Sequence, residues 1–170
     1  RPSRHSSVSR GAALAFAAQV TLRSFVGATG KLPYPSVVDA RIPAFGFSRT
    51  RDGADHAPEW QGQAVPLVYL VAPTAAILAP DLARGLIRNA LAVAQSDGWI
   101  DGRPGLGGQR SGQLAPPLLA SATWAVYQIT EDKHFLAESF AALRRFYDRW
   151  FARDMDRDGD GVPEWVNADQ

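Results

Sequence analysis

The last seventeen residues of the chain hold a dense group of carboxylates. Five carboxylates fall within residues 154–164, and three of them occupy every second position before Gly161: Asp156, Asp158 and Asp160. This spacing is similar to the first half of a calcium loop, in which oxygen ligands at positions 1, 3 and 5 precede a turn-forming glycine. Like charges this close together repel one another unless a cation lies among them. The run therefore indicates a hard divalent cation.

Two registers place this run on a calcium loop. Counting from Asp154 leaves Trp165 at position 12, whereas counting from Asp156 leaves Asn167 there, so neither register ends in the glutamate of an EF-hand. The second register predicts a structural calcium ion with these ligands: Asp156, Asp158, Asp160, the Val162 carbonyl and Glu164. Magnesium is disfavoured, because it takes few protein ligands in strict octahedral geometry. The alternative is a solvated acidic turn that caps the preceding helix and pairs with Arg153 and Arg157.

Composition limits the function classes. The 170 residues are 46% hydrophobic and 21% charged, as expected of one globular domain rather than a disordered chain. A net charge of +1 without a basic stripe argues against a nucleic-acid partner. There is no cysteine, which excludes disulfides and thiolate chemistry. Five tryptophans and four tyrosines suit sugar binding, and equally suit a large core.

Hydrophobic periodicity predicts about five helices joined by long loops. After a tail at residues 1–8, these helices are expected at 9–26, 64–79, 80–95, 114–130 and 132–151, with long loops at 28–63 and 96–113. The second and fourth helices are uncharged and apolar nearly all round. Their prolines argue against membrane spans, and burial inside a soluble protein explains them equally well.

The third and fifth helices are amphipathic. In the third, apolar positions Leu82, Leu86, Ile87, Leu91 and Ala94 oppose polar positions Arg84, Arg88 and Asn89. In the fifth, the expected buried stripe is Leu136, Phe140, Leu143, Tyr147 and Trp150. We also assign Trp124 and Tyr127, in the fourth helix, to packing.

The order of helices predicts an all-α, incomplete (α/α)6 toroid. An apolar helix, a short joint, an amphipathic helix and a long loop occur twice in succession. In an antiparallel series every second connection lies at the same end, so the long loops should emerge on one face. Five helices are too few to close such a ring. The chain also starts at Arg1 rather than methionine and stops within an expected loop, so we expect a single partial domain over residues 1–170.

Several segments, in this order and spacing, resemble the front half of a glycoside hydrolase family 63 catalytic domain, with the trehalases as a wider neighbourhood. The resemblance covers roughly residues 61–170. It is carried by these segments: Asp97-Gly-Trp-Ile100, Pro116-Pro-Leu-Leu-Ala120, Trp124-Ala-Val-Tyr127, Phe135-Leu-Ala-Glu138 and the run from Arg153 to Trp165. The Gly-Asp-Gly-Val-Pro-Glu-Trp part of the last run is the most specific. Some family members carry calcium at the matching loop.

The resemblance implies an inverting exo-glycosidase that acts on α-glucosides or related sugars. One carboxylic acid protonates the leaving oxygen, while a carboxylate roughly 6.5–9.5 Å away activates water. In the family the acid lies in a Ser/Thr-Gly-x-Asp-like segment shortly after the Pro-Glu-Trp run, and the base lies much later. Both are therefore expected beyond residue 170, and this piece alone is expected to be inactive. Asp169 is near the expected acid but does not lie in that motif.

The resemblance leaves substrate-binding residues as the expected site within this chain, with a carbohydrate as the partner. These are Trp60, Trp99, Arg110, Gln113 and Trp165. Gln61 stands where the family often has an aspartate, and the Arg110 to Gln113 segment departs from the trehalase pattern by insertions. For the tryptophans the alternative is a role in the core, and for Arg110 it is solvation.

Two other functions stay open at this point. One is a non-catalytic, calcium-stabilised helical module that binds carbohydrate or acts as a scaffold. The other is a different α/α-toroid enzyme, such as a lyase or epimerase, which would need a histidine facing the site. Of the three histidines only His56 falls on a long loop, since His5 is in the tail and His134 begins an outer helix.

Overall fold

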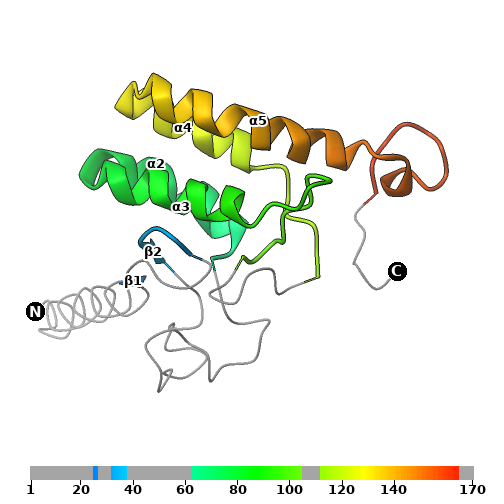
Figure 1. The fold of residues 1–170 in the computed structure, drawn as a ribbon, viewed down its shortest axis with the longest axis horizontal. Helices are drawn as coiled ribbons and strands as arrows, with labels where there is room; N and C mark the ends of the chain where they lie inside the picture. The colour runs from blue at the N-terminus through cyan, green and yellow to red at the C-terminus, as the bar shows by residue number, and fades with distance from the viewer. Residues whose placement is uncertain (1–24, 27–31, 38–62, 105–111, 165–170) are drawn as a thin grey trace, which may run out of the picture.

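The computed structural model describes residues 25–26, 32–37, 63–104 and 112–164 of the chain. Within these residues the fold consists of four α-helices, a short 3-10 helix (η4) and two very short strands (Figure 1). The elements are β1 (Phe25–Val26), β2 (Ser36–Val37), α2 (Val65–Leu78), α3 (Pro80–Ala92), α4 (Leu119–Thr130), α5 (Lys133–Trp150) and η4 (Arg153–Met155). None of the described helices is both long and apolar enough to cross a membrane.

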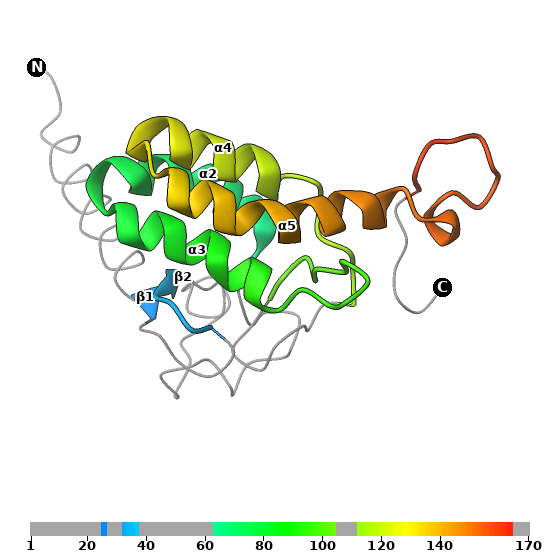
Figure 2. The ribbon, with the colours of Figure 1, turned by 45° about the horizontal axis from the view of Figure 1, so that its top comes forward.

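The helices form two antiparallel hairpins with tight joints at one end. Pro80 occupies the first turn of α3, where its missing N–H costs no hydrogen bond. At the second joint Glu131 adopts φ 53°, and the Asp132 carboxylate caps α5 by accepting the Phe135 N–H at 2.9 Å. The described loops that follow α3 and α5 emerge together at the opposite end (Figure 2). This confirms, for these two loops, the predicted common face.

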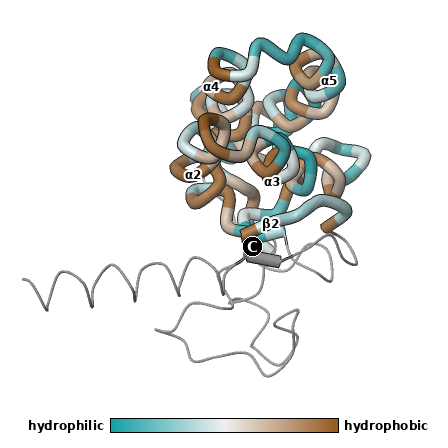
Figure 3. Tube along the Cα trace, turned by 90° about the vertical axis from the view of Figure 1, so that its left-hand side faces the viewer, coloured by the Kyte–Doolittle hydropathy of each residue, from teal (hydrophilic) through white to brown (hydrophobic). Residues whose placement is uncertain are grey.

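The two apolar helices lie beside each other, and each contacts the amphipathic helix that follows it (Figure 3). The shared core is small and aliphatic on α2, with Val65, Val68, Ala72 and Ala76 buried. Leu86 and Ile87 of α3 and Val126 of α4 complete it. An apolar layer of α2 and α4 beside an amphipathic layer of α3 and α5 is the arrangement of an α/α toroid. The fold is therefore all-α, an incomplete toroid, as predicted.

Residues 32–37 are fixed to α3 by buried amides, which corrects the prediction for Asn89. This side chain, expected on the polar face, is fully buried and bonds both the N–H and the carbonyl of Tyr34, each at 3.0 Å. Gln63 accepts the Ser36 hydroxyl at 2.6 Å and donates to the Leu86 carbonyl at 2.5 Å. A polar residue can lie on a buried face when its hydrogen bonds are complete.

The predicted stripe on α5 is wrong in part. The buried residues of this helix are Phe135, Ser139, Phe146 and Trp150. Phe140 and Tyr147, which we expected in the core, are 64% and 60% exposed. The helix is apolar over two adjacent faces, so periodicity alone did not show which one meets α3 and α4. Trp124 of α4 is likewise 52% exposed instead of packed.

Two predicted element boundaries are also corrected. The helix expected at 9–26 falls mostly outside the described residues, but its last two form β1, which pairs antiparallel with β2. The helix expected at 114–130 begins only at Leu119. Leu114 forms a bridge with Asp101, and the two prolines that follow cannot donate a backbone hydrogen bond. The tail at 1–8 and most of the loop at 28–63 lie outside the described residues.

Candidate functional site

The loop after α3, residues 93–102, makes a tight turn that carries Trp99; we refer to it as the tryptophan loop. Asp97 caps the turn by accepting the Trp99 N–H at 3.0 Å, and the Trp99 carbonyl accepts the Gln95 N–H at 2.9 Å. Gly98 lies directly on the backbone of α5 with φ +90°. A Cβ there would stand 2.2 Å from the Arg145 carbonyl oxygen. Only glycine allows this approach, so the sequence Asp-Gly-Trp sets the height of Trp99 above α5.

A second segment pairs with the tryptophan loop and brings Gln113 to the same end of the helices. Asp101 and Leu114 form an antiparallel bridge, and the Gln113 carbonyl accepts the Gly102 N–H at 2.8 Å. The Asp101 carboxylate, only 1% exposed, accepts N–H groups from Arg103 at 2.7 Å and Gly112 at 2.9 Å. Asp101 thus holds both ends of the intervening loop. The Gln113 side chain is exposed to solvent, where it could reach a ligand.

Trp150 ties this paired segment to α5. Its indole N–H donates to the Ala115 carbonyl at 3.2 Å, and its ring is nearly buried in the core. The assignment of Trp150 to packing is confirmed. The end of α5 therefore contacts the segment that follows Gln113.

Arg149 joins the tryptophan loop to the loop that follows α5. Its guanidinium makes a two-pronged ion pair with Asp154, at 2.8 and 2.7 Å, and lies 5.4 Å from the centre of the Trp99 ring. Its Nε lies 3.4 Å from Asp97 Oδ2. The hydrogen bonds from Arg149 hold the pKa of Asp154 below its ordinary value. The sequence analysis missed Arg149 and Asp101, since nothing in their spacing marks either one.

The loop after α5, residues 151–164, closes on itself; we refer to it as the acidic loop. Met155 anchors it in the core, and the Met155 carbonyl accepts the Glu164 N–H at 2.6 Å. Gly159 and Gly161 adopt φ +75° and +85°, as a sharp turn requires. Each of the three alternating aspartates accepts a backbone N–H from a later residue of the loop, at 2.8–3.2 Å.

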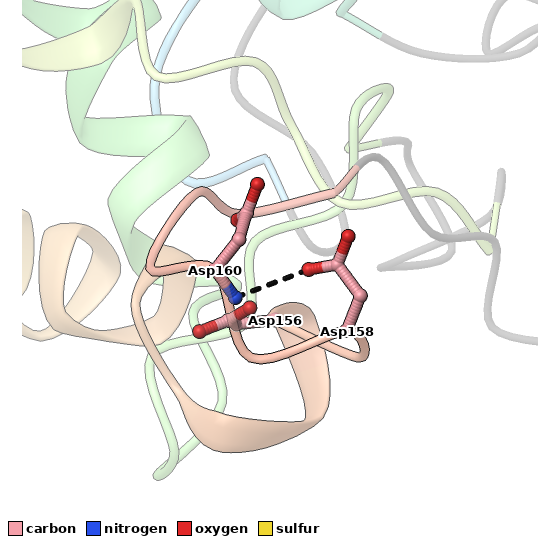
Figure 4. Close-up of side chains that lie close together, drawn as sticks. All are labelled: Asp156, Asp158 and Asp160. Atoms are coloured by element: carbon pink, nitrogen blue, oxygen red, sulfur yellow. Dashed lines mark hydrogen bonds between the residues drawn. The ribbon is translucent and has the colours of Figure 1, made fainter.

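The loop gathers three of the five predicted calcium ligands. Asp156, Asp158 and Asp160 each present one carboxylate oxygen, and these oxygens all lie within 4.8 Å of one another (Figure 4). Two ligands on opposite sides of a calcium ion stand about 4.6–5.2 Å apart, so the spacing of these three oxygens leaves room for a divalent cation among them. Asp156 Oδ1 is buried without a hydrogen-bond partner, and a cation would satisfy it. Glu164 instead accepts the Arg157 N–H at 2.9 Å, which draws it toward the start of the loop.

The other predicted site residues differ in where they lie. Trp60, Arg110 and Trp165 lie outside the described residues. Val162 is exposed, and its N–H donates to Asp160. Trp99 is partly buried against the edge of the core and is covered on one side by Arg149, so it combines packing with partial access. Among the described residues, the candidate site thus consists of Trp99 and Gln113 on one loop system, beside the acidic loop.

Comparison with known protein families places most of this chain in a glycoside hydrolase domain family. Residues 68–169 match the family model of the mannosylglycerate hydrolase MGH1-like glycoside hydrolase domain. The matched part runs from the first turn of α2 to the end of the acidic loop and beyond, and it covers more than half of the chain. It confirms the resemblance to a family 63-like glycosidase, which was carried by segments of the same region. The chain belongs to the MGH1-like glycoside hydrolase family.

Proposed function

We propose that this glycosidase domain serves an inverting, exo-acting enzyme whose substrates are α-linked glucosides or related sugars. The family description adds mannosylglycerate, a mannoside with an acidic aglycone, as a candidate within this substrate class. The observation that carries the proposal is the convergence of Trp99, Gln113 and the acidic loop at one end of the four helices. Sites on helical scaffolds are commonly built from loops gathered in this way.

In this proposal the chain contributes the sugar-binding part of the reaction. The part of the Trp99 ring that is not buried packs against the apolar face of a sugar ring, and the Gln113 amide both donates to and accepts from sugar hydroxyls. Trp60, Arg110 and Trp165 are further proposed contacts. An inverting mechanism also needs an acid and a base roughly 6.5–9.5 Å apart, with water between the base and the sugar. The Ser/Thr-Gly-x-Asp motif expected for the acid does not occur in the sequence.

Calorimetric titration with sugars tests the binding role. The panel is an aryl α-glucoside, an aryl α-mannoside and mannosylglycerate, titrated into wild type, Trp99→Ala and Gln113→Ala. We expect Trp99→Ala to weaken binding at least about tenfold, which corresponds to about 1.4 kcal/mol. Tyr147→Ala is the matched control, because this aromatic residue is exposed on the outer side of α5. Equal affinity in wild type and Trp99→Ala would refute the proposed site.

Turnover assays test the placement of the catalytic groups. We expect no measurable hydrolysis of the panel by this chain of 170 residues. Hydrolysis of the aryl α-glucoside would show that an acid and a base lie within it. If a longer protein that includes this domain releases a sugar of retained anomeric configuration, as followed by proton NMR, the inverting mechanism is wrong.

We also propose that the acidic loop binds a structural calcium ion. Asp156, Asp158 and Asp160 would supply carboxylate oxygens, with the Val162 carbonyl and Glu164 as the remaining ligands. Bound there, the ion neutralises the cluster of charges and fixes the loop, and it takes no part in activating water. Glu164 already accepts the Arg157 N–H through Oε2, so only its other oxygen is free to join the set, and we expect it to contribute least.

Calcium calorimetry on wild type and Asp158→Ala tests this proposal. We expect binding in wild type and at least a tenfold loss in the variant, about 1.4 kcal/mol. Asp148→Ala is the control, since it removes an exposed carboxylate of α5 outside the loop. Equal, weak binding in wild type and Asp158→Ala would remove the site.

A further inference from the structure

We propose that Arg149 is a positioning residue that couples the acidic loop to Trp99. Its guanidinium donates two hydrogen bonds to Asp154. The same group lies over the Trp99 ring and faces the Asp97 carboxylate. Its side chain is only 11% exposed, so water competes little for these contacts. The planar fork of arginine presents its donors in fixed directions. A movement of Asp154 must therefore turn the group that lies against Trp99.

Two buried polar atoms without a hydrogen-bond partner lie in this region, one on Arg149 itself and one in the acidic loop. Among the described residues, the buried side-chain nitrogens and oxygens without a hydrogen-bond partner are Arg149 Nε and Asp156 Oδ1. Buried polar atoms are nearly always paired in folded proteins, so both atoms have hydrogen-bonding capacity to spare. Arg149 Nε lies 3.4 Å from Asp97 Oδ2, and closure by a few tenths of an ångström would bring the two within the usual hydrogen-bond range.

The path between the two atoms is short. Asp156 follows the 3-10 turn Arg153–Met155, which also carries Asp154, and Met155 is buried beneath it. A shift of Asp156 toward a cation therefore displaces Asp154 and, through it, Arg149. At the other end Gly98 is held against the backbone of α5, so the loop cannot follow as a whole. The freedom that remains belongs to the Asp97 and Trp99 side chains.

The consequence is reciprocal linkage between the two loops. If a cation at the acidic loop changes the position of Trp99, it changes sugar affinity, and bound sugar changes cation affinity by the same factor. This part rests on the sugar site and the calcium site proposed above. The contact through Arg149 itself rests on neither, so it can be tested without any ligand.

Hydrogen exchange followed by mass spectrometry tests the contact in the ligand-free protein. The readout is a peptide covering residues 95–101, compared with a peptide from α2, in wild type, Asp154→Asn, Arg149→Gln and Arg149→Lys. We expect Asp154→Asn to speed exchange of the 95–101 peptide at least about fivefold, as much as Arg149→Gln does, and to leave α2 unchanged. Arg149→Lys should bring the exchange of the 95–101 peptide only slightly closer to wild type, because lysine keeps the charge but lacks the planar, two-pronged guanidinium.

The control is Arg144→Gln, which removes an exposed arginine of the same helix whose nearest carboxylate lies 3.8 Å away. It should leave the 95–101 peptide as in wild type. Unchanged exchange of that peptide in Asp154→Asn, or equal acceleration of the α2 peptide, would overturn the coupling, because the role of Arg149 would then be general stability.

Calorimetry then tests the linkage. In wild type we expect saturating sugar to tighten calcium binding at least about fivefold, and in Arg149→Gln we expect sugar to have no effect. If sugar changes calcium affinity by the same factor in wild type and in Arg149→Gln, the linkage does not run through Arg149. If wild type binds no calcium, the calcium proposal and the linkage fail together, while the exchange result still decides whether Arg149 couples the loops.

Discussion

Replacement of Gly98 by alanine is the sharpest test of how the tryptophan loop is held. The added Cβ would meet the Arg145 carbonyl oxygen at 2.2 Å and its carbon at 2.6 Å, and both atoms belong to the backbone of α5. Backbone atoms within a helix cannot rotate away, so the loop itself must move. A φ of +90° adds a second cost, because residues with a side chain avoid this region.

The two costs can be estimated separately. The unfavourable φ costs roughly 1–2 kcal/mol. Forced overpacking typically costs another 1–3 kcal/mol, so Gly98→Ala should lower the free energy of unfolding by about 2–5 kcal/mol. Gly159→Ala is the matched control, since Gly159 has φ +75° but nothing within 4 Å of the added Cβ. Gly159→Ala should show only the cost of the unfavourable φ, about 1–2 kcal/mol or less.

Equilibrium unfolding in urea, followed by circular dichroism, measures both variants against wild type. The reasoning requires Gly98→Ala to be the more destabilising of the two by at least about 1 kcal/mol, with an unchanged dependence on urea. Free energies of unfolding that agree within about 0.5 kcal/mol would mean that the contact with α5 does not constrain the loop. The geometric account of Trp99 would then be wrong.

Three further outcomes follow from buried or capping side chains. Asn89→Leu should lower the free energy of unfolding by about 1–3 kcal/mol in the same urea assay, because it leaves two backbone groups of the segment before β2 unpaired. The control Gln128→Leu, on the exposed side of α4, should have little effect. Trp150→Phe should cost about 1–2 kcal/mol through the lost indole hydrogen bond and some packing, and Trp124→Phe, at an exposed position, less than about 0.5 kcal/mol. The Phe135 N–H and other favourable contacts hold the pKa of Asp132 below its ordinary 3.8, so its ionised form stabilises the fold above that pH and the benefit is lost as pH falls through the lowered pKa. Near neutral pH, wild type should therefore have a higher midpoint temperature of thermal unfolding than Asp132→Asn. Below about pH 4 the two midpoint temperatures should converge. A difference that stays constant down to about pH 2 would contradict this assignment.

The residues placed at the proposed site illustrate what spacing can predict. The three alternating aspartates were found from sequence, since ligands in one short loop are close in space whatever the rest of the fold does. Trp99 and Gln113 came from resemblance, and their placement at the same end of the helices depends on the bridge between Asp101 and Leu114. Arg149 was missed because its partners, Asp97 and Asp154, meet it only after α5 has packed beside the tryptophan loop.

The sequence by itself determined the number and order of the four described helices, the tight joints between them and the gathering of the loops after α3 and α5 at one end. These features depend on local properties: proline and aspartate at helix starts, and apolar periodicity. Only the tertiary structure decided which of two apolar faces of α5 is buried, that Asn89 is an internal residue, and that Arg149 links the two loops. Each of these depends on contacts between distant segments, which local pattern does not encode.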